Sequence, residues 1–205
     1  VFGLQVGRPG WQSALQAPGF MILAVVSGAA LLILVAAAAR YIPGAREKLT
    51  IPTFAWLSNL MTILLGIYLY FLLAELLTAG YNPTDAAWRV TSSLLIGTYA
   101  VLNWFSISML VLATGLGGLQ MARRRYSLPM MVIMGVLVTV SAILQRYLIV
   151  VPSLTTGALL PYKEGTYSPT IIEYGVVLGL IALGTLMFLA FLKVVPIMAI
   201  QKESD

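Results

Sequence analysis

Three ionisable residues lie inside long apolar stretches of the sequence: Glu75, Arg146 and Glu173. A charged side chain inside a bilayer costs at least about 2.5 kcal/mol, so each of these residues needs a partner or a function. A carboxylate can carry protons to and from a redox ligand, and a guanidinium can polarise an oxygen atom or pair with an acid. We therefore take Glu75 and Glu173 as candidate proton carriers and Arg146 as a candidate ligand-binding or ion-pairing residue.

The same three residues also have structural interpretations. The stretch Thr170-Ile-Ile-Glu173 fits a capping box, in which the glutamate closes back on the start of a helix. Glu75 lies close to the end of its apolar stretch, and Arg146 is long enough to snorkel to the interface. For the two glutamates both interpretations stay open. For Arg146, which is deeper and follows Gln145, we favour a buried partner, either an acid or an acceptor on a ligand.

The elements that must position these residues follow from composition. Of 205 residues, 60% are hydrophobic and only 9% are charged, whereas soluble domains are about a quarter charged. This excludes a soluble globular protein. Five apolar runs reach the roughly 20 residues that a helix needs to cross a bilayer. We predict an all-α integral membrane protein, a bundle of about five transmembrane helices, with spans at 19–39, 54–77, 90–116, 128–151 and 171–196.

The beginning of the chain differs from these runs. Residues 1–18 are interrupted by Gly and Pro and contain Trp11, which is typical of an interfacial segment that precedes a first span. Residues 19–205 then form the five-helix domain, without a separate soluble module. The sequence starts at Val1 rather than Met and has no signal-peptide pattern. We expect a fragment of a larger membrane subunit.

The distribution of Lys and Arg predicts the orientation. Eight basic residues fall on one side of the five predicted spans and three on the other, with Arg146 inside a span. The positive-inside rule places the richer side in the cytoplasm, and with it the C-terminus. The richer side holds Arg40, Arg46, Lys48, Arg123, Arg124, Arg125, Lys193 and Lys202, and the other holds Arg8, Arg89 and Lys163.

Polar residues also recur at helical spacing. Tyr99, Asn103 and Ser106 fall on one stripe of the run 90–116, and Tyr68 shares a helix face with Glu75. Inside a bundle, such a stripe forms hydrogen bonds between helices or lines a hydrated path. Both interpretations remain open, so the stripe is a candidate polar path.

The residue types exclude several kinds of chemistry. The chain contains neither His nor Cys, which excludes Cys-ligated iron–sulfur clusters, bis-His haem, Cys/His zinc sites and His-activated nucleophiles. The basic residues lie between apolar runs rather than on one basic face, so we expect no nucleic-acid partner. A quinone headgroup, by contrast, needs a donor and a carboxylate in an apolar slot. Arg146 with Glu75 or Glu173 would supply both.

Three stretches carry a family resemblance. They are Gly7-Arg8-Pro9-Gly10-Trp11 before a helix rich in small residues, Gln145-Arg146-Tyr147 near a helix end, and Tyr167-Ser168-Pro169-Thr170-Ile171-Ile172-Glu173 at the start of the last helix. Their order and spacing resemble the NrfD/PsrC family, the membrane subunit of polysulfide reductase and its relatives. The similarity covers essentially the whole chain, and five spans match the later portion of the family fold.

The resemblance implies a function and partners. Members are quinone-interacting subunits of respiratory or electron-transfer oxidoreductase complexes in the cell (inner) membrane. They use menaquinone or ubiquinone as substrate, bind no haem or metal of their own, and exchange electrons with a ferredoxin-type iron–sulfur subunit and further redox subunits. On this basis Arg8, Trp11 and Tyr167, on the predicted outer face, are candidate partner-docking residues. Two other functions remain open: a transporter or channel segment that uses the polar stripe, and a purely structural membrane anchor.

Overall fold

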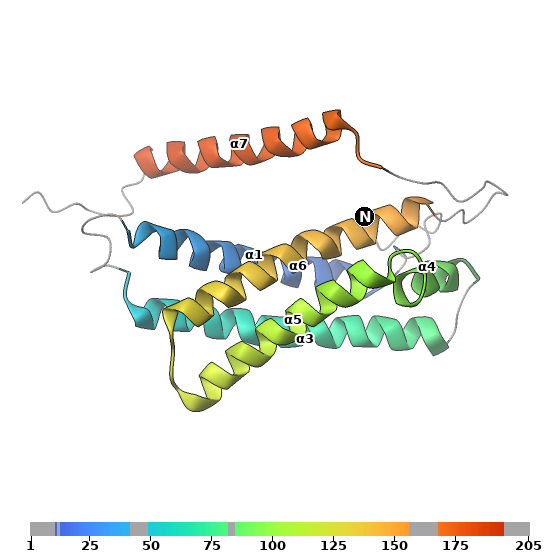
Figure 1. The fold of residues 1–205 in the computed structure, drawn as a ribbon, viewed down its shortest axis with the longest axis horizontal. Coiled ribbons are helices and arrows are strands. Elements are labelled where there is room, and N and C mark those ends of the chain that lie inside the picture. Colours follow the sequence, from blue (N-terminus) through green and yellow to red (C-terminus); the bar gives the residue numbers. More distant parts are fainter. Residues whose placement is uncertain (1–10, 12, 42–48, 82–84, 156–167, 195–205) are drawn as a thin grey trace, which may run out of the picture. The chain divides into compact units, whose positions relative to one another are not determined.

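The chain forms helices throughout the part that the computed structural model describes, which excludes residues 1–10, 12, 42–48, 82–84, 156–167 and 195–205. Five of these helices are long and apolar enough to cross a membrane, so the prediction of an all-α membrane protein with about five spanning helices is confirmed. The helices are α1 (Gln16–Ala39), α3 (Ile51–Tyr81), α4 (Asp85–Leu95), α5 (Ala100–Arg123), α6 (Leu128–Thr155) and α7 (Ile171–Val194) (Figure 1).

The chain divides into two units, residues 1–165 and 166–205. In the first unit, α5 packs along α6, and α1 lies against both α3 and α6. The short helix α4 lies at the end of the bundle where α3 and α6 finish (Figure 1). Leu, Ile, Val, Met and Ala side chains fill the space between the long helices. The buried core includes Leu23, Val26, Ala30, Ile33, Met61, Leu65, Leu110, Met131, Met134 and Val138.

The outward faces of the long helices are as apolar as their core. Met21, Trp56 and Val101 are among many large hydrophobic side chains that are exposed on the first unit. In water such a continuous apolar surface would drive association, whereas in a bilayer it contacts lipid tails. This explains why hydrophobic residues surround each helix instead of occupying one stripe.

The helix bounds differ from the predicted runs most clearly in the third span. The run 90–116 is divided between α4, which ends at Leu95, and α5, which begins at Ala100. The turn between them passes so close to the preceding helix that a Cβ atom on Gly97 would lie 2.7 Å from the Ser93 Cα atom. Only glycine fits there. The first helix also begins earlier than predicted, at Gln16, inside the segment 1–18.

Side chains of α5 cap the C-terminal end of α4. The Asn103 side-chain amide donates to the Leu94 carbonyl at 3.1 Å, and the Trp104 indole donates to the Leu95 carbonyl at 3.0 Å. The last carbonyls of a helix have no partner within it, and an unpaired carbonyl is costly where water is scarce. These two bonds therefore hold α4 against the start of α5.

In the middle of the bundle, two buried serines form a hydrogen-bonded pair and the helices pack closely. Ser106 and Ser141 are fully buried, their hydroxyls lie 2.7 Å apart, and the Ser141 hydroxyl also donates to the Ser106 carbonyl at 2.9 Å. Further along α5, toward its C-terminal end, Gly117 lies against Thr62 and Met134. Contacts through small residues of this kind let helix backbones approach closely.

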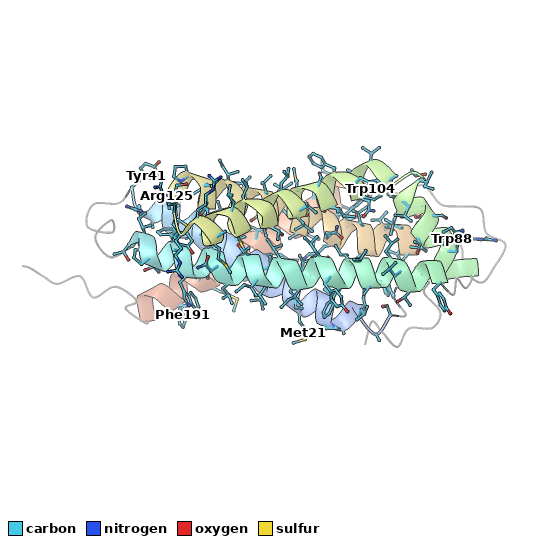
Figure 2. All side chains as sticks on the ribbon, turned by 90° about the horizontal axis from the view of Figure 1, so that it is seen from below. Met21, Tyr41, Trp88, Trp104, Arg125 and Phe191 are labelled. Atoms are coloured by element: carbon cyan, nitrogen blue, oxygen red, sulfur yellow. The ribbon has the colours of Figure 1, made fainter. Side chains whose placement is uncertain are left out.

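The ends of the first unit differ in charge. Figure 2 shows Tyr41 and Arg125 at one end, after α1 and α5, and Trp88 at the other. Arg124 ends α5 in the left-handed conformation, with φ of 49°. Beyond it, the Tyr126 hydroxyl and the Asn59 side-chain amide are hydrogen-bonded, with the amide nitrogen 2.9 Å from the hydroxyl. The basic residues that end α5 are thus placed at the end opposite to α4.

The second unit contains α7. Its first turn carries Glu173, whose carboxylate accepts a 2.9 Å hydrogen bond from the Thr170 hydroxyl, while its backbone N–H donates to the Thr170 carbonyl at 3.1 Å. A carboxylate in the first turn also interacts favourably with the helix dipole. Thr170 and Glu173 therefore pair at the helix start, through a bond between their side chains rather than through the two side-chain-to-backbone bonds of a capping box.

Replacing Gly117 by alanine tests the close packing of the bundle. The new methyl group would collide with Thr62 and Met134, so we expect Gly117→Ala to lower stability by about 1–3 kcal/mol. Gly118→Ala is the matched control, because nothing lies within 4 Å of its Cβ position and alanine is favoured over glycine within a helix. The thermal unfolding midpoint of the purified protein in detergent measures the stability of both variants. Equal midpoints for the two variants would contradict the packing described above.

Candidate functional site

A cavity of about 180 Å3 lies at the α4 end of the first unit. Its walls come from five helices: the start of α1, the last turns of α3, one face of α4, the start of α5 and the late part of α6. Most of the lining is aliphatic or aromatic. The apolar lining includes Leu15, Gly19, Phe20, Leu23, Phe71, Leu72, Leu76, Ala79, Val90, Leu94, Leu95, Ile107, Leu148 and Ile149.

Six polar side chains from the five helices also line this cavity: Gln16, Tyr68, Glu75, Thr91, Asn103 and Gln145. Gln16, Tyr68, Asn103 and Gln145 are buried, whereas Glu75 is half-buried. The Tyr68 hydroxyl lies within electrostatic reach of both Glu75 and Arg146. An apolar slot with a few convergent polar groups is the usual form of a small-molecule site.

The amide nitrogen of Gln145 is distinctive among these groups. The side chain is only 4% exposed, and its Nε2 atom is buried without a hydrogen-bond partner in the part of the chain that the structure describes. The Asn103 amide, by comparison, is already bonded to the Leu94 carbonyl. The Gln145 amide nitrogen is therefore an unused donor in the cavity wall, as far as the described residues show.

Arg146 does not line this cavity. It is exposed on the first unit, its guanidinium lies 5.7 Å from the centre of the Phe20 ring, and it lines a separate shallow groove between α1 and α6. Successive helical residues are about 100° apart, so when Gln145 faces the cavity Arg146 faces the α1 side. Arg146 thus reaches the site indirectly, through Phe20 and through its charge near Tyr68. The expected buried partner for Arg146 is not found among the described residues.

The predicted polar stripe forms hydrogen bonds between elements. Tyr99 pairs with Thr155 at 3.2 Å, Asn103 with the Leu94 carbonyl, and Ser106 with Ser141. Only Asn103 of the three lines the cavity. These contacts support the first of the two interpretations of the stripe, interhelical hydrogen bonding.

The remaining predicted site residues are Trp11, Arg8, Tyr167 and Glu173. Trp11 donates from its indole nitrogen to the Ile149 carbonyl at 2.9 Å, three residues before Pro152, which lies inside α6 and has no N–H to donate. Arg8 and Tyr167 lie outside the described residues. Glu173 belongs to the second unit, where it pairs with Thr170.

Comparison with known proteins shows the family of the chain. The family model described as polysulphide reductase, NrfD, matches residues 1–158. The chain belongs to the NrfD family. The matched range contains all the helices that line the cavity.

Two curated relatives of this NrfD chain are reductase subunits by name. It is 31% identical to a putative dimethyl sulfoxide reductase membrane subunit of Halobacterium salinarum, with 96% of the chain and 49% of the relative covered. It is 26% identical to a selenate reductase subunit of Mesobacillus selenatarsenatis, with 99% of the chain and 48% of the relative covered. The chain therefore spans about half the length of these relatives.

Sequence reasoning missed Gln16 and Gln145 as lining residues and assigned no role to Tyr68. A signal for Tyr68 was present, because it lies seven residues before Glu75 on one helix face. Gln145 was passed over in favour of the charged neighbour that follows it. In the described ranges, the NrfD chain has no group of three or more His, Cys, Asp or Glu residues that could hold a metal ion.

Replacing Asn103 by leucine tests how the α4 wall is held. The Leu94 carbonyl would lose its partner, at a cost of about 1–3 kcal/mol, so we expect roughly tenfold faster amide hydrogen exchange in residues 85–95. Ser108→Ala is the control, because Ser108 donates only to the Phe105 carbonyl of its own helix. Hydrogen exchange followed by mass spectrometry compares the variants. Unchanged exchange in Asn103→Leu would contradict the capping role.

Proposed function

We propose that this chain is the quinone- and quinol-binding part of a membrane subunit in a multi-subunit respiratory or electron-transfer oxidoreductase. The quinone, menaquinone or ubiquinone, is its substrate. Electrons pass between the quinone and an iron–sulfur subunit of ferredoxin type, which in turn serves a further redox subunit. The names of the curated relatives, subunits of dimethyl sulfoxide and selenate reductases, support a reductase complex of this kind.

The cavity at the α4 end is the observation that carries the proposal. A dry engineered cavity of about 150 Å3 takes a benzene ring, so about 180 Å3 is enough for a single quinone ring. The apolar walls suit the ring and its tail, and the cavity opens between helices whose outer faces are hydrophobic. A quinone dissolved in the bilayer would then reach the site without crossing water.

The polar groups match the chemistry of the ligand. Reduction of a quinone takes up two electrons, here from the iron–sulfur partner, and two protons, one on each oxygen, and oxidation of the quinol reverses both. The Glu75 carboxyl group is able to give or accept a proton, and the Tyr68 hydroxyl is able to donate or accept a hydrogen bond. Glu75 is therefore the proposed proton carrier and Tyr68 its neighbour in the site. Arg146 contributes a positive charge beside the site and packs over the ring of Phe20, which lines the cavity.

Glu173 has weaker support as a proton carrier, because its carboxylate pairs with Thr170 at a helix start. For Arg8, Trp11 and Tyr167, partner docking stays a prediction. We also propose that the C-terminus of the chain and the basic loop at Arg123–Arg125 face the cytoplasm. The α4 end and its cavity then lie toward the opposite side of the cell membrane.

Removing the proton-carrying group tests the function. In the membrane-assembled complex, we expect Glu75→Gln to lower the quinol oxidation rate by about 10²–10⁴-fold, the usual contribution of a general acid or base. Glu75→Asp, which keeps the carboxyl group, should retain more activity. Tyr68→Phe should slow turnover about fivefold, since a neutral hydrogen bond contributes about 1 kcal/mol.

Tyr70→Phe is the control for the hydroxyl, because Tyr70 is 64% exposed and does not line the cavity. Assembly is checked by co-purification of the iron–sulfur subunit. Parental quinol turnover in assembled Glu75→Gln and Tyr68→Phe complexes would instead favour a purely structural anchor.

Single-cysteine labelling tests the orientation. The chain contains no cysteine, so Ser204→Cys and Ser168→Cys each introduce one reactive thiol, near the C-terminus and before α7. A membrane-impermeant maleimide should label Ser204→Cys in inside-out vesicles and Ser168→Cys in right-side-out vesicles. The reverse pattern would place the basic loops on the outer side.

A further inference from the structure

The cavity contains a donor that no other described residue uses, the side-chain amide of Gln145. Its Nε2 atom is buried without a hydrogen-bond partner among these residues, in a side chain that is only 4% exposed. Leaving such a group unpaired is unfavourable, because it has lost its hydrogen bonds to water and gained none in the protein. A buried amide without a partner in a cavity is therefore a position where a ligand acceptor would be bound.

We infer that Gln145 is the residue that orients the quinone ring, donating from Nε2 to one carbonyl oxygen of the oxidised ligand and accepting at Oε1 from the hydroxyl of the reduced ligand. This inference rests on the proposed function, since it takes the ligand to be a quinone. It adds the residue that sets the position of the ring. Glu75 and Tyr68, from α3, remain available for proton transfer.

The chemistry of the amide suits both redox forms. A glutamine side chain carries two N–H donors and one carbonyl acceptor, and rotation about its last torsion exchanges them. A guanidinium has only donors, so it could not accept the hydrogen bond that the hydroxyl of the reduced form donates. With Gln145 in the wall and Arg146 turned toward Phe20, the site binds quinone and quinol with similar contacts.

The environment also favours a neutral donor. The cavity lies among Phe20, Ile107 and Leu148, where an unpaired cation would be strongly penalised. The position of Gln145 on α6 supplies a hydrogen bond there without a net charge. Arg146, the next residue in the helix, keeps its charge on the α1 side.

Spectroscopy of the unmutated protein gives the first test. The assembled complex, prepared with glutamine labelled with 15N in the side-chain amide, is reduced in steps in the presence of a short-chain ubiquinone analogue or a naphthoquinone analogue until a semiquinone radical forms. We expect the radical to show hyperfine coupling to a side-chain amide nitrogen. Gln145→Met, which keeps the volume but has no donor, should abolish this coupling.

Kinetics gives the second test, with a matched control on α5. Gln145→Met should raise the KM for the quinol about tenfold, the effect of about 1.4 kcal/mol of lost binding, with a smaller change in kcat. Gln120 is also a buried glutamine, 3% exposed and without amide partners among the described residues, but it does not line the cavity. Gln120→Met should leave both the KM and the coupling unchanged.

The outcomes separate the two proposals. A semiquinone without amide coupling, or equal KM values for the two variants with normal turnover, would overturn the role of Gln145 and leave the quinone function standing. Absence of both quinone-dependent turnover and a semiquinone in the assembled, unmutated complex would overturn the quinone function and this inference with it.

Discussion

The structure depends on satisfying backbone carbonyls at the places where its helices are interrupted inside apolar surroundings. A bilayer offers no water to bond an exposed carbonyl. The turn after α4 leaves the Leu94 and Leu95 carbonyls for Asn103 and Trp104, and the Ile149 carbonyl near Pro152 accepts from Trp11. Leu94, Leu95 and Ile149 all line the cavity. The cavity thus lies beside the turn after α4, where Asn103 and Trp104 hold the end of that helix, and Trp11 adds a bond to α6, which continues to Thr155.

The polar residues in the middle of the first unit differ from those of the cavity. In the middle of the bundle, Ser106 and Ser141 bond to each other, and Gly117 brings α5 against Thr62. Polar groups there find partners in the neighbouring helix, which is the usual arrangement in membrane bundles. At the α4 end, by contrast, the buried Gln145 amide nitrogen has no partner among the described residues, in a side chain that lines the cavity. Gln120 also lacks partners but does not line the cavity, so a candidate ligand-binding residue is distinguished by an unpaired polar group together with a position in the cavity wall.

The fold could be predicted from hydropathy because long apolar runs have few alternatives in a membrane, and this accounts for the five spanning helices. Hydropathy did not reveal the break at Gly97, because the two residues before it, Leu95 and Ile96, are apolar and keep the local hydropathy high. Whether a glycine bends the chain or merely allows close packing, as Gly117 does, depends on which atoms approach it. That information belongs to the folded chain and not to the sequence pattern.

The candidate site could be predicted from the sequence less well than the fold. Hydropathy reasoning selects residues by the cost of burying them, and a guanidinium is far more costly than an amide, so Arg146 stood out and Gln145 did not. The cost of burial, however, is also a reason for the fold to turn a charge away from a dry cavity. One step along α6 is enough, because it rotates the side chain by about 100°. In a membrane site built on helices, the neutral polar residue beside a conspicuous charge is therefore the better candidate for direct contact with an uncharged ligand, and the charge acts on it from the adjoining face.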